Sequence, residues 1–210
     1  MADPRQPRAR RFVSRGGDKL DAALDALSIK VNDARALDAG ASTGGFTDCL
    51  LQRGAREVIA VDVAYGQFAW TLRNDGRVRL LERTNVRTLR PESVGNLDVL
   101  VADLSFISLS GLASTFAALR PEDMVLMVKP QFELPRAHVP AGGVVREPRA
   151  WIEAMETAAR AYRNAGYALC GAVSSPLPGP KGNREFFLHF EREGTDVGDD
   201  VIERAAETAP

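Results

Sequence analysis

The sequence predicts an α/β fold with a mostly parallel central sheet, helices on both faces and an antiparallel edge. Three observations support this prediction. Helical and strand patterns alternate along the chain, as a parallel sheet requires. A strand pattern over residues 36–39 leads through a turn of small residues into an amphipathic helix. An acid, Asp62, closes the next strand 22 residues after Gly40, which suits the spacing of about 20 residues for a ribose-binding carboxylate in a doubly wound sheet.

The first predicted helix covers residues 18–28, because Leu20, Leu24 and Leu27 fall on one helical face. Strand patterns follow at residues 35–38, 58–63, 78–82, 97–102 and 124–128, and helices are predicted at residues 44–53, 67–74 and 110–119.

A longer helix is predicted over residues 148–165. Pro148 stands at its start and Gly166 just past its end, which are favoured positions for these residue types. Its apolar stripe consists of Trp151, Met155, Ala159 and Tyr162. The chain then returns through residues 167–173, a loop over 175–183 and residues 185–190, and we predict the first and last of these as adjacent antiparallel strands at the sheet edge. The sequence contains no internal repeat and no clear second domain.

The turn after the first strand indicates which nucleotide-like ligand it suits. A phosphate-binding loop would place a lysine where Phe46 stands, and a dinucleotide fingerprint would place glycine where Ser42 stands. S-adenosylmethionine carries no phosphate and has a cationic sulfonium, so it needs acids and close backbone rather than an anion site. The turn therefore favours S-adenosylmethionine, although a tight strand-to-helix turn that binds no ligand has the same pattern.

Composition sets ordinary limits on the function. The chain has 210 residues and a net charge of −1, and none of its apolar runs approaches the ~18 residues of a membrane span. We therefore expect a single, soluble, cytosolic domain. Cys49 and Cys170 are isolated, and His138 and His189 are far apart in the sequence, so we predict neither a metal site nor a disulfide.

Charge is unevenly distributed along the chain. Residues 191–210 carry a net charge of −5, which leaves +4 on residues 1–190. Arginines gather near the start, where they could neutralise phosphates of a nucleic acid or form a disordered basic lead-in. They are Arg5, Arg8, Arg10, Arg11 and Arg15.

Two further strands end in a charged residue. Asp103 follows the buried strand pattern over 97–102, and Lys129 follows that over 124–128. Each alone is consistent with a helix cap or a solvated strand end. Because the carboxyl ends of neighbouring parallel strands meet at one edge, the two together favour a site beside the cofactor turn.

Several ordered motifs resemble those of the TlyA-type hemolysin/rRNA methyltransferases, which belong to the FtsJ-like ribose 2′-O-methyltransferases. The resemblance runs from about residue 12 to residue 190. Its motifs are S-R-G-G-D-K-L (14–20), L-D-A-G-A-S-T-G-G-F (37–46), Y-G-Q (65–67), E-R-T-N (82–85), A-D-L-S-F-I-S (102–108), V-K-P-Q-F-E (128–133) and P-L-P-G-P (176–180).

The resemblance implies a Rossmann-like sheet, S-adenosylmethionine as methyl donor and a Lys-Asp-Lys-Glu catalytic tetrad. The tetrad falls on Lys19, Asp103, Lys129 and Glu185. For the cofactor, the resemblance implies Asp62 at the ribose, Asn85 near the adenine, and Asp103 beside a loop made of Asp38, Gly40, Ala41, Ser42, Thr43, Gly44, Gly45 and Phe46.

A tetrad of this kind suits an alcohol nucleophile. A ribose hydroxyl must be positioned in line with the methyl group and must lose its proton as it attacks. We take Lys129 as the base, which acts only when neutral. Burial and the second ammonium of Lys19 favour the neutral form, whereas Asp103 and Glu185 oppose it. Amino-group methylation is less favoured, because A-D-L-S-F stands where such enzymes carry [DN]-P-P-[FY].

The predicted organisation is a basic, flexible lead-in over 1–11, an FtsJ-like domain over 12–191 and an acidic, flexible tail over 192–210. TlyA-type proteins carry a small RNA-binding domain before the methyltransferase domain, and this sequence has only 11 residues there. We therefore expect either a shortened chain or a stand-alone catalytic domain. The predicted acceptor is ribosomal RNA. The alternative is the hydroxyl or enol of a small molecule, and a pore-forming hemolysin has little support without a membrane segment.

Overall fold

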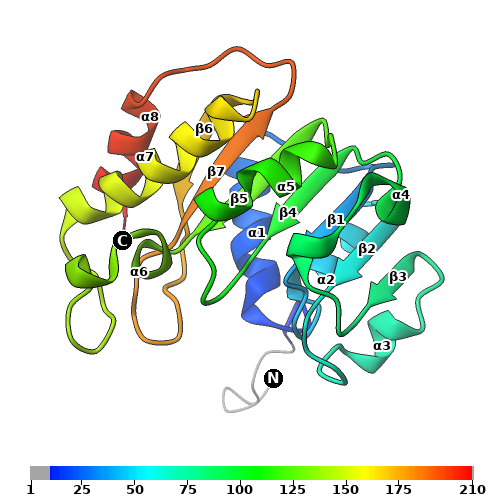
Figure 1. Cartoon of the computed structure of the whole chain (residues 1–210). Helices are drawn as coiled ribbons and strands as arrows, with labels where there is room; N and C mark the ends of the chain where they lie inside the picture. Colours follow the sequence, from blue (N-terminus) through cyan, green and yellow to red (C-terminus); the bar gives the residue numbers. More distant parts are fainter. Residues whose placement is uncertain (1–9, 210) are drawn as a thin grey trace, which may run out of the picture.

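The computed structural model describes residues 10–209 and contains a seven-stranded sheet covered by helices on both faces (Figure 1). The strands are β1 (Arg35–Ala39), β2 (Glu57–Val61), β3 (Val78–Leu81), β4 (Val99–Ala102), β5 (Asp123–Val128), β6 (Ala168–Ser174) and β7 (Phe186–Glu191). The α-helices are α1 (Arg15–Ala26), α2 (Gly45–Gln52), α3 (Trp70–Arg73), α4 (Pro91–Val94), α5 (Ala113–Ala118), α6 (Pro130–Glu133), α7 (Pro148–Asn164) and α8 (Asp200–Glu207). Short 3₁₀ helices are η1 (Val86–Thr88), η2 (Ser110–Leu112) and η3 (Arg136–His138).

The strand order β3-β2-β1-β4-β5-β7-β6 confirms the predicted fold class. Strands β1 to β5 are mutually parallel, and β7 runs antiparallel to both β5 and β6. The predicted antiparallel pair therefore forms, with β6 as the outer strand. Because β7 is reversed, its first residue lies beside the last residue of β5, where Phe186 pairs with Val128.

Apolar side chains from the strands form one core cluster on each face of the sheet. Helices α1 and α2 cover one face, and α5, α7 and α8 cover the other (Figure 1). In α7, Tyr162 is fully buried and stacks on Phe190 with ring centroids 4.9 Å apart. The helix predicted at residues 67–74 is shorter in the structure, because only Trp70–Arg73 is helical.

The acidic C-terminal segment differs from the predicted flexible tail. Residues 200–207 form helix α8, whose Ile202, Ala205 and Ala206 are buried in the core. Before this helix, the Arg163 guanidinium bonds to Asp196 and holds the pKa of that carboxyl well below its usual range. The acids within α8, which are Asp200, Glu203 and Glu207, are exposed on the side of the helix away from the core. Of the predicted lead-in, residues 1–9 lie outside the described part of the chain.

Candidate active site

The turn between β1 and α2 contains glycines at positions where a larger side chain would collide with neighbouring parts of the protein. Gly40 has φ +90°, and a Cβ there would lie 2.5 Å from the carbonyl oxygen of Asp103. A Cβ on Gly44 would lie 2.5 Å from Leu72 Cδ1, and one on Gly45 would overlap Ser14 Oγ. A close ligand is one expected reason for small residues at this turn. The structure adds a second reason, which is the close approach of β4, α3 and α1 to the turn.

Asp62 lies just past β2 and faces a pocket of about 340 Å³. Its Oδ2 accepts a hydrogen bond from Ser42 N and its Oδ1 accepts one from Ala64 N, each at 2.7 Å. Asn85 and residues 103–107 line the same pocket. The structure thus brings together the residues predicted for the ribose and the adenine, and each Asp62 oxygen keeps a second lone pair for a hydroxyl donor.

Asp38 lies beneath the turn and is fully buried. Its Oδ2 accepts a hydrogen bond from Thr47 Oγ1 at 2.7 Å, whereas Oδ1 is buried with no hydrogen-bond partner. Burial raises the pKa of Asp38 to about 7, and the nearby charges of Asp103 and Asp62 add to that rise. A buried anion with a free acceptor atom is suited to a cationic ligand group. Because Asp38 is not among the residues that line the two pockets beside the turn, its charge would act on a cationic cofactor across the turn rather than by direct contact.

Asp38→Asn is expected to stabilise the ligand-free protein above neutral pH. Between about pH 4 and pH 7 the unfolded carboxyl is ionised while the folded one keeps its proton, so the free energy of unfolding falls as pH rises. The asparagine has no such penalty, and at pH 8 we expect a gain of about 1–3 kcal/mol after the cost of its unpaired amide group.

Urea unfolding of both proteins at pH 5 and pH 8 measures this difference. The gain should shrink toward pH 5, where less than half of the penalty has developed. A variant that is equally destabilised at both pH values would contradict the assignment of an ionised, strained Asp38.

All four residues of the predicted tetrad line one pocket of about 370 Å³ beside the β1–α2 turn. They form two ion pairs. Lys129 Nζ lies 2.5 Å from Asp103 Oδ1 and donates to Ser105 Oγ at 3.1 Å. Lys19 Nζ lies 2.5 Å from Glu185 Oε2, and both of these side chains are more than 90% buried. Residues far apart in the sequence therefore meet at one edge of the sheet.

The sheet topology explains this convergence. Asp103 and Lys129 directly follow the parallel strands β4 and β5, so both lie at the carboxyl edge. Glu185 directly precedes β7, and the reversal of β7 places it at the same edge. Lys19 reaches this edge from α1. The predicted cofactor residues Ala41, Ser42, Thr43, Gly45 and Phe46 line the same pocket, whereas Gly44 faces Leu72 and Phe68.

Two buried polar residues that hold the site together were not predicted. Glu133 in α6 accepts hydrogen bonds from Ser108 Oγ at 2.9 Å, from Ser110 N at 3.3 Å and from Leu109 N. It thereby anchors the loop that follows Asp103. Asn183 donates to Gly143 O and accepts from Val145 N, joining two loops beside the pocket. Both residues stand inside or beside recognised motifs, but only the structure shows their partners.

A second pocket, of about 440 Å³, adjoins the tetrad pocket and shares Lys129 and Glu185 with it. We call it the outer pocket. Lys129 and Glu185 line it together with Phe106, Phe132 and Lys181. The Phe106 side chain is 88% exposed, its backbone has φ +65°, and its ring lies 5.2 Å from that of Phe132. An aromatic ring held out to solvent at the mouth of a pocket offers a stacking surface to a planar group.

Comparisons with known proteins identify the family. Residues 12–192 match the family described as FtsJ-like methyltransferase. The chain is 49% identical over 210 residues to the 16S/23S rRNA (cytidine-2′-O)-methyltransferase TlyA of Mycobacterium tuberculosis, covering 96% of this chain and 78% of that protein. It is 39% identical over 184 residues to Hemolysin A of Brachyspira hyodysenteriae, covering 86% of this chain and 77% of that protein.

A solved structure from Streptococcus thermophilus, of a protein provisionally named a hemolysin, superimposes with a TM-score of 0.91 at 37% identity, covering 96% of this chain and 75% of that one. In spite of these hemolysin names, no helix among residues 10–209 is long and apolar enough to cross a membrane.

Proposed function

Because the chain belongs to the FtsJ-like methyltransferase family, in its TlyA-type branch, we propose that it methylates ribose 2′-hydroxyls of ribosomal RNA. It is an S-adenosylmethionine-dependent methyltransferase. The proposal of 2′-hydroxyl methylation rests on one pocket beside the β1–α2 turn. Four residues meet there: Lys19, Asp103, Lys129 and Glu185. A small-molecule hydroxyl is the less favoured acceptor, since the Mycobacterium tuberculosis relative and a Campylobacter jejuni relative are named as rRNA methyltransferases.

The pockets suggest how the two substrates are placed. The pocket at Asp62 and Asn85 is suited to the adenosine, and the pocket along the β1–α2 turn is suited to the remainder of the cofactor. The outer pocket, which Lys129 shares, is left for the acceptor nucleotide. Its exposed Phe106 ring is suited to stack on an unpaired base, as aromatic side chains commonly do in RNA recognition.

S-adenosylmethionine supplies an electrophilic methyl group on a sulfonium. With that group bound, Lys129 Nζ would accept the proton of the 2′-hydroxyl as its oxygen attacked the methyl group, and the sulfur would leave with the bonding electron pair. Asp103 and Ser105 contact Lys129 Nζ and orient it. The buried Lys19–Glu185 pair fixes the neighbouring wall of the pocket.

The acceptor is tested by incubating the protein with radiolabelled S-adenosylmethionine and purified ribosomal subunits. We expect label in the RNA at positions that resist alkaline cleavage, since that cleavage needs a free 2′-hydroxyl. Calorimetry should show saturable binding of S-adenosylmethionine or its demethylated product and none of NAD.

Asp62→Asn should weaken cofactor binding about tenfold through the loss of charge-assisted hydrogen bonds. Asp200→Asn is the matched control, because Asp200 is an exposed acid at the start of α8 and lines neither of the pockets assigned to the cofactor. Robust cofactor binding with no label in any subunit would favour the small-molecule acceptor. Binding of NAD in place of S-adenosylmethionine would contradict the cofactor assignment.

A further inference from the structure

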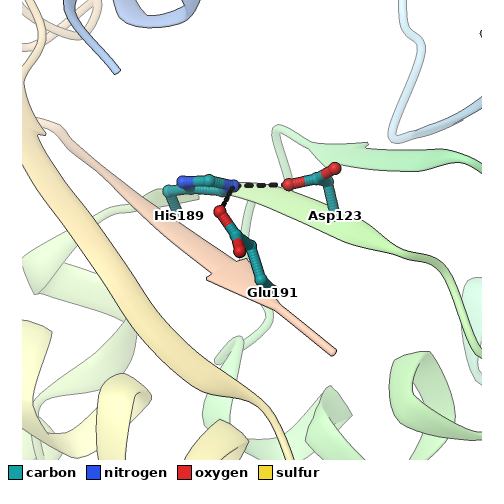
Figure 2. Close-up of side chains that lie close together, drawn as sticks. All are labelled: Asp123, His189 and Glu191. Atoms are coloured by element: carbon teal, nitrogen blue, oxygen red, sulfur yellow. Dashed lines mark hydrogen bonds and ion pairs between the residues drawn. The ribbon is translucent and has the colours of Figure 1, made fainter. Parts of the chain in front are cut away.

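Three potential metal ligands meet at the end of the sheet opposite the candidate active site (Figure 2). Asp123 is the first residue of β5 and pairs in register with Glu191, the last residue of β7. His189 lies two residues before Glu191 and therefore on the same face of the sheet. The active-site residues Lys129 and Glu185 lie at the other ends of these two strands, six residues from Asp123 and Glu191 respectively, which is roughly 20 Å at about 3.3 Å per residue.

The side chains converge on one nitrogen of the imidazole. His189 Nε2 lies 2.6 Å from Asp123 Oδ1 and 3.8 Å from Glu191 Oε1. One ligand atom from each residue lies within 4.8 Å of the others. Three such atoms lie at most roughly 2.8 Å from a common point, so small rotations of the two carboxylates bring all three to the roughly 2.0–2.2 Å of zinc–nitrogen and zinc–oxygen bonds.

The burial of the three side chains suits an ion that enters from solvent. The His189 side chain is only 7% exposed and is thus held in place, whereas those of Asp123 and Glu191 are 35% and 43% exposed. A neutral imidazole offers one proton at most at Nε2, so it cannot satisfy both carboxylates at once. Within residues 10–209, neither carboxylate has any other ionic partner, and the adjacent Arg192 pairs with Glu122.

We propose that Asp123, His189 and Glu191 form a binding site for a divalent transition-metal ion of the zinc type. One imidazole and two carboxylates are ligands that zinc accepts, and water completes the coordination. The three residues line none of the three pockets described above and lie at the opposite end of the sheet from the tetrad, so we assign the ion a structural role. It cross-links β5 to β7, the two strands whose opposite ends carry Lys129 and Glu185.

Sequence spacing could not indicate this site. Asp123 and His189 are 66 positions apart, and the expectation of no metal site rested on the lack of closely spaced histidines and cysteines. Antiparallel pairing of β5 with β7 brings the ligands together.

The test uses the whole chain without a histidine tag, stripped with a chelator and kept reduced. Titration with zinc chloride at pH 7.5 is expected to show one saturable equivalent and a rise in melting temperature. His189→Gln, Asp123→Asn and Glu191→Gln should each weaken binding at least tenfold. His138→Gln is the matched control, since His138 is the other histidine of the chain and lies in the exposed η3 beside Glu153.

Cobalt(II) gives an independent readout, because its visible absorption reports ligand geometry. The wild-type and His138→Gln proteins should give the same cobalt spectrum, and the Glu191→Gln variant, which changes the most exposed ligand, should lose it while remaining folded. Absence of saturable zinc binding would overturn the proposal. Binding that survives all three ligand substitutions, or that is lost equally in His138→Gln, would overturn it as well.

Discussion

Replacing Lys129 with alanine is expected to lower the rate of methyl transfer at least about 10³-fold, within the range that a general base contributes. The Lys129 side chain is only 10% exposed, ends strand β5 and is shared by the tetrad pocket and the outer pocket. It is therefore the amine placed between the cofactor turn and the space left for the acceptor. Asp103→Ala should have a similar effect, since it removes the carboxylate 2.5 Å from the lysine nitrogen.

Two measurements separate a catalytic defect from a folding defect. Calorimetry should show that the Lys129→Ala variant still binds S-adenosylmethionine, because the adenosine pocket at Asp62 does not include Lys129. Lys30→Ala, which removes an exposed lysine between α1 and β1, should retain wild-type turnover. Near wild-type turnover of Lys129→Ala would show that another group takes the proton.

Asp103 and Lys129 could be placed at one site from the sequence pattern because the sheet topology brings them together, whereas Lys19 and Glu185 were placed by the family resemblance. Asp103 and Lys129 end short apolar runs that are typical of buried parallel strands, and such strands present their carboxyl ends at one edge. Glu185 is different. Its place at this edge depends on the reversal of β7, and the predicted antiparallel pair of strands implied that reversal.

Other features depend on contacts that local patterns do not contain. Glu133 caps the loop after Asp103 through three hydrogen bonds across 23 to 25 positions, and nothing in its own motif indicates those partners. The acidic tail was misinterpreted for another reason. Its charge suggested a solvated segment, whereas Ile202, Ala205 and Ala206 carry the i, i+3, i+4 spacing of an amphipathic helix. In this segment the apolar spacing predicted the structure better than the net charge.

RNA binding is expected to weaken about 10³-fold or more between 50 and 200 mM salt, as for a protein that contacts six or more phosphates. Arg10 and Arg15 line the tetrad pocket, and both are exposed. Arg11 is less available, because it pairs with Asp21 and lies over the ring of Phe12. Deleting residues 1–11 removes four arginines. It should therefore reduce the slope of log K against log salt by less than four phosphate contacts would.

Single substitutions make this expectation sharper. Arg15→Gln should reduce the slope of log K against log salt by roughly 0.7–0.9, the value of one phosphate contact. Arg160→Gln should leave the slope unchanged, since Arg160 is exposed on α7, on the opposite face of the sheet from α1. Filter binding of ribosomal RNA fragments across the salt range measures both slopes. An affinity that does not depend on salt, or an equal loss in both variants, would remove the α1 side of the pocket from the RNA-binding surface and shift support to a small, uncharged acceptor.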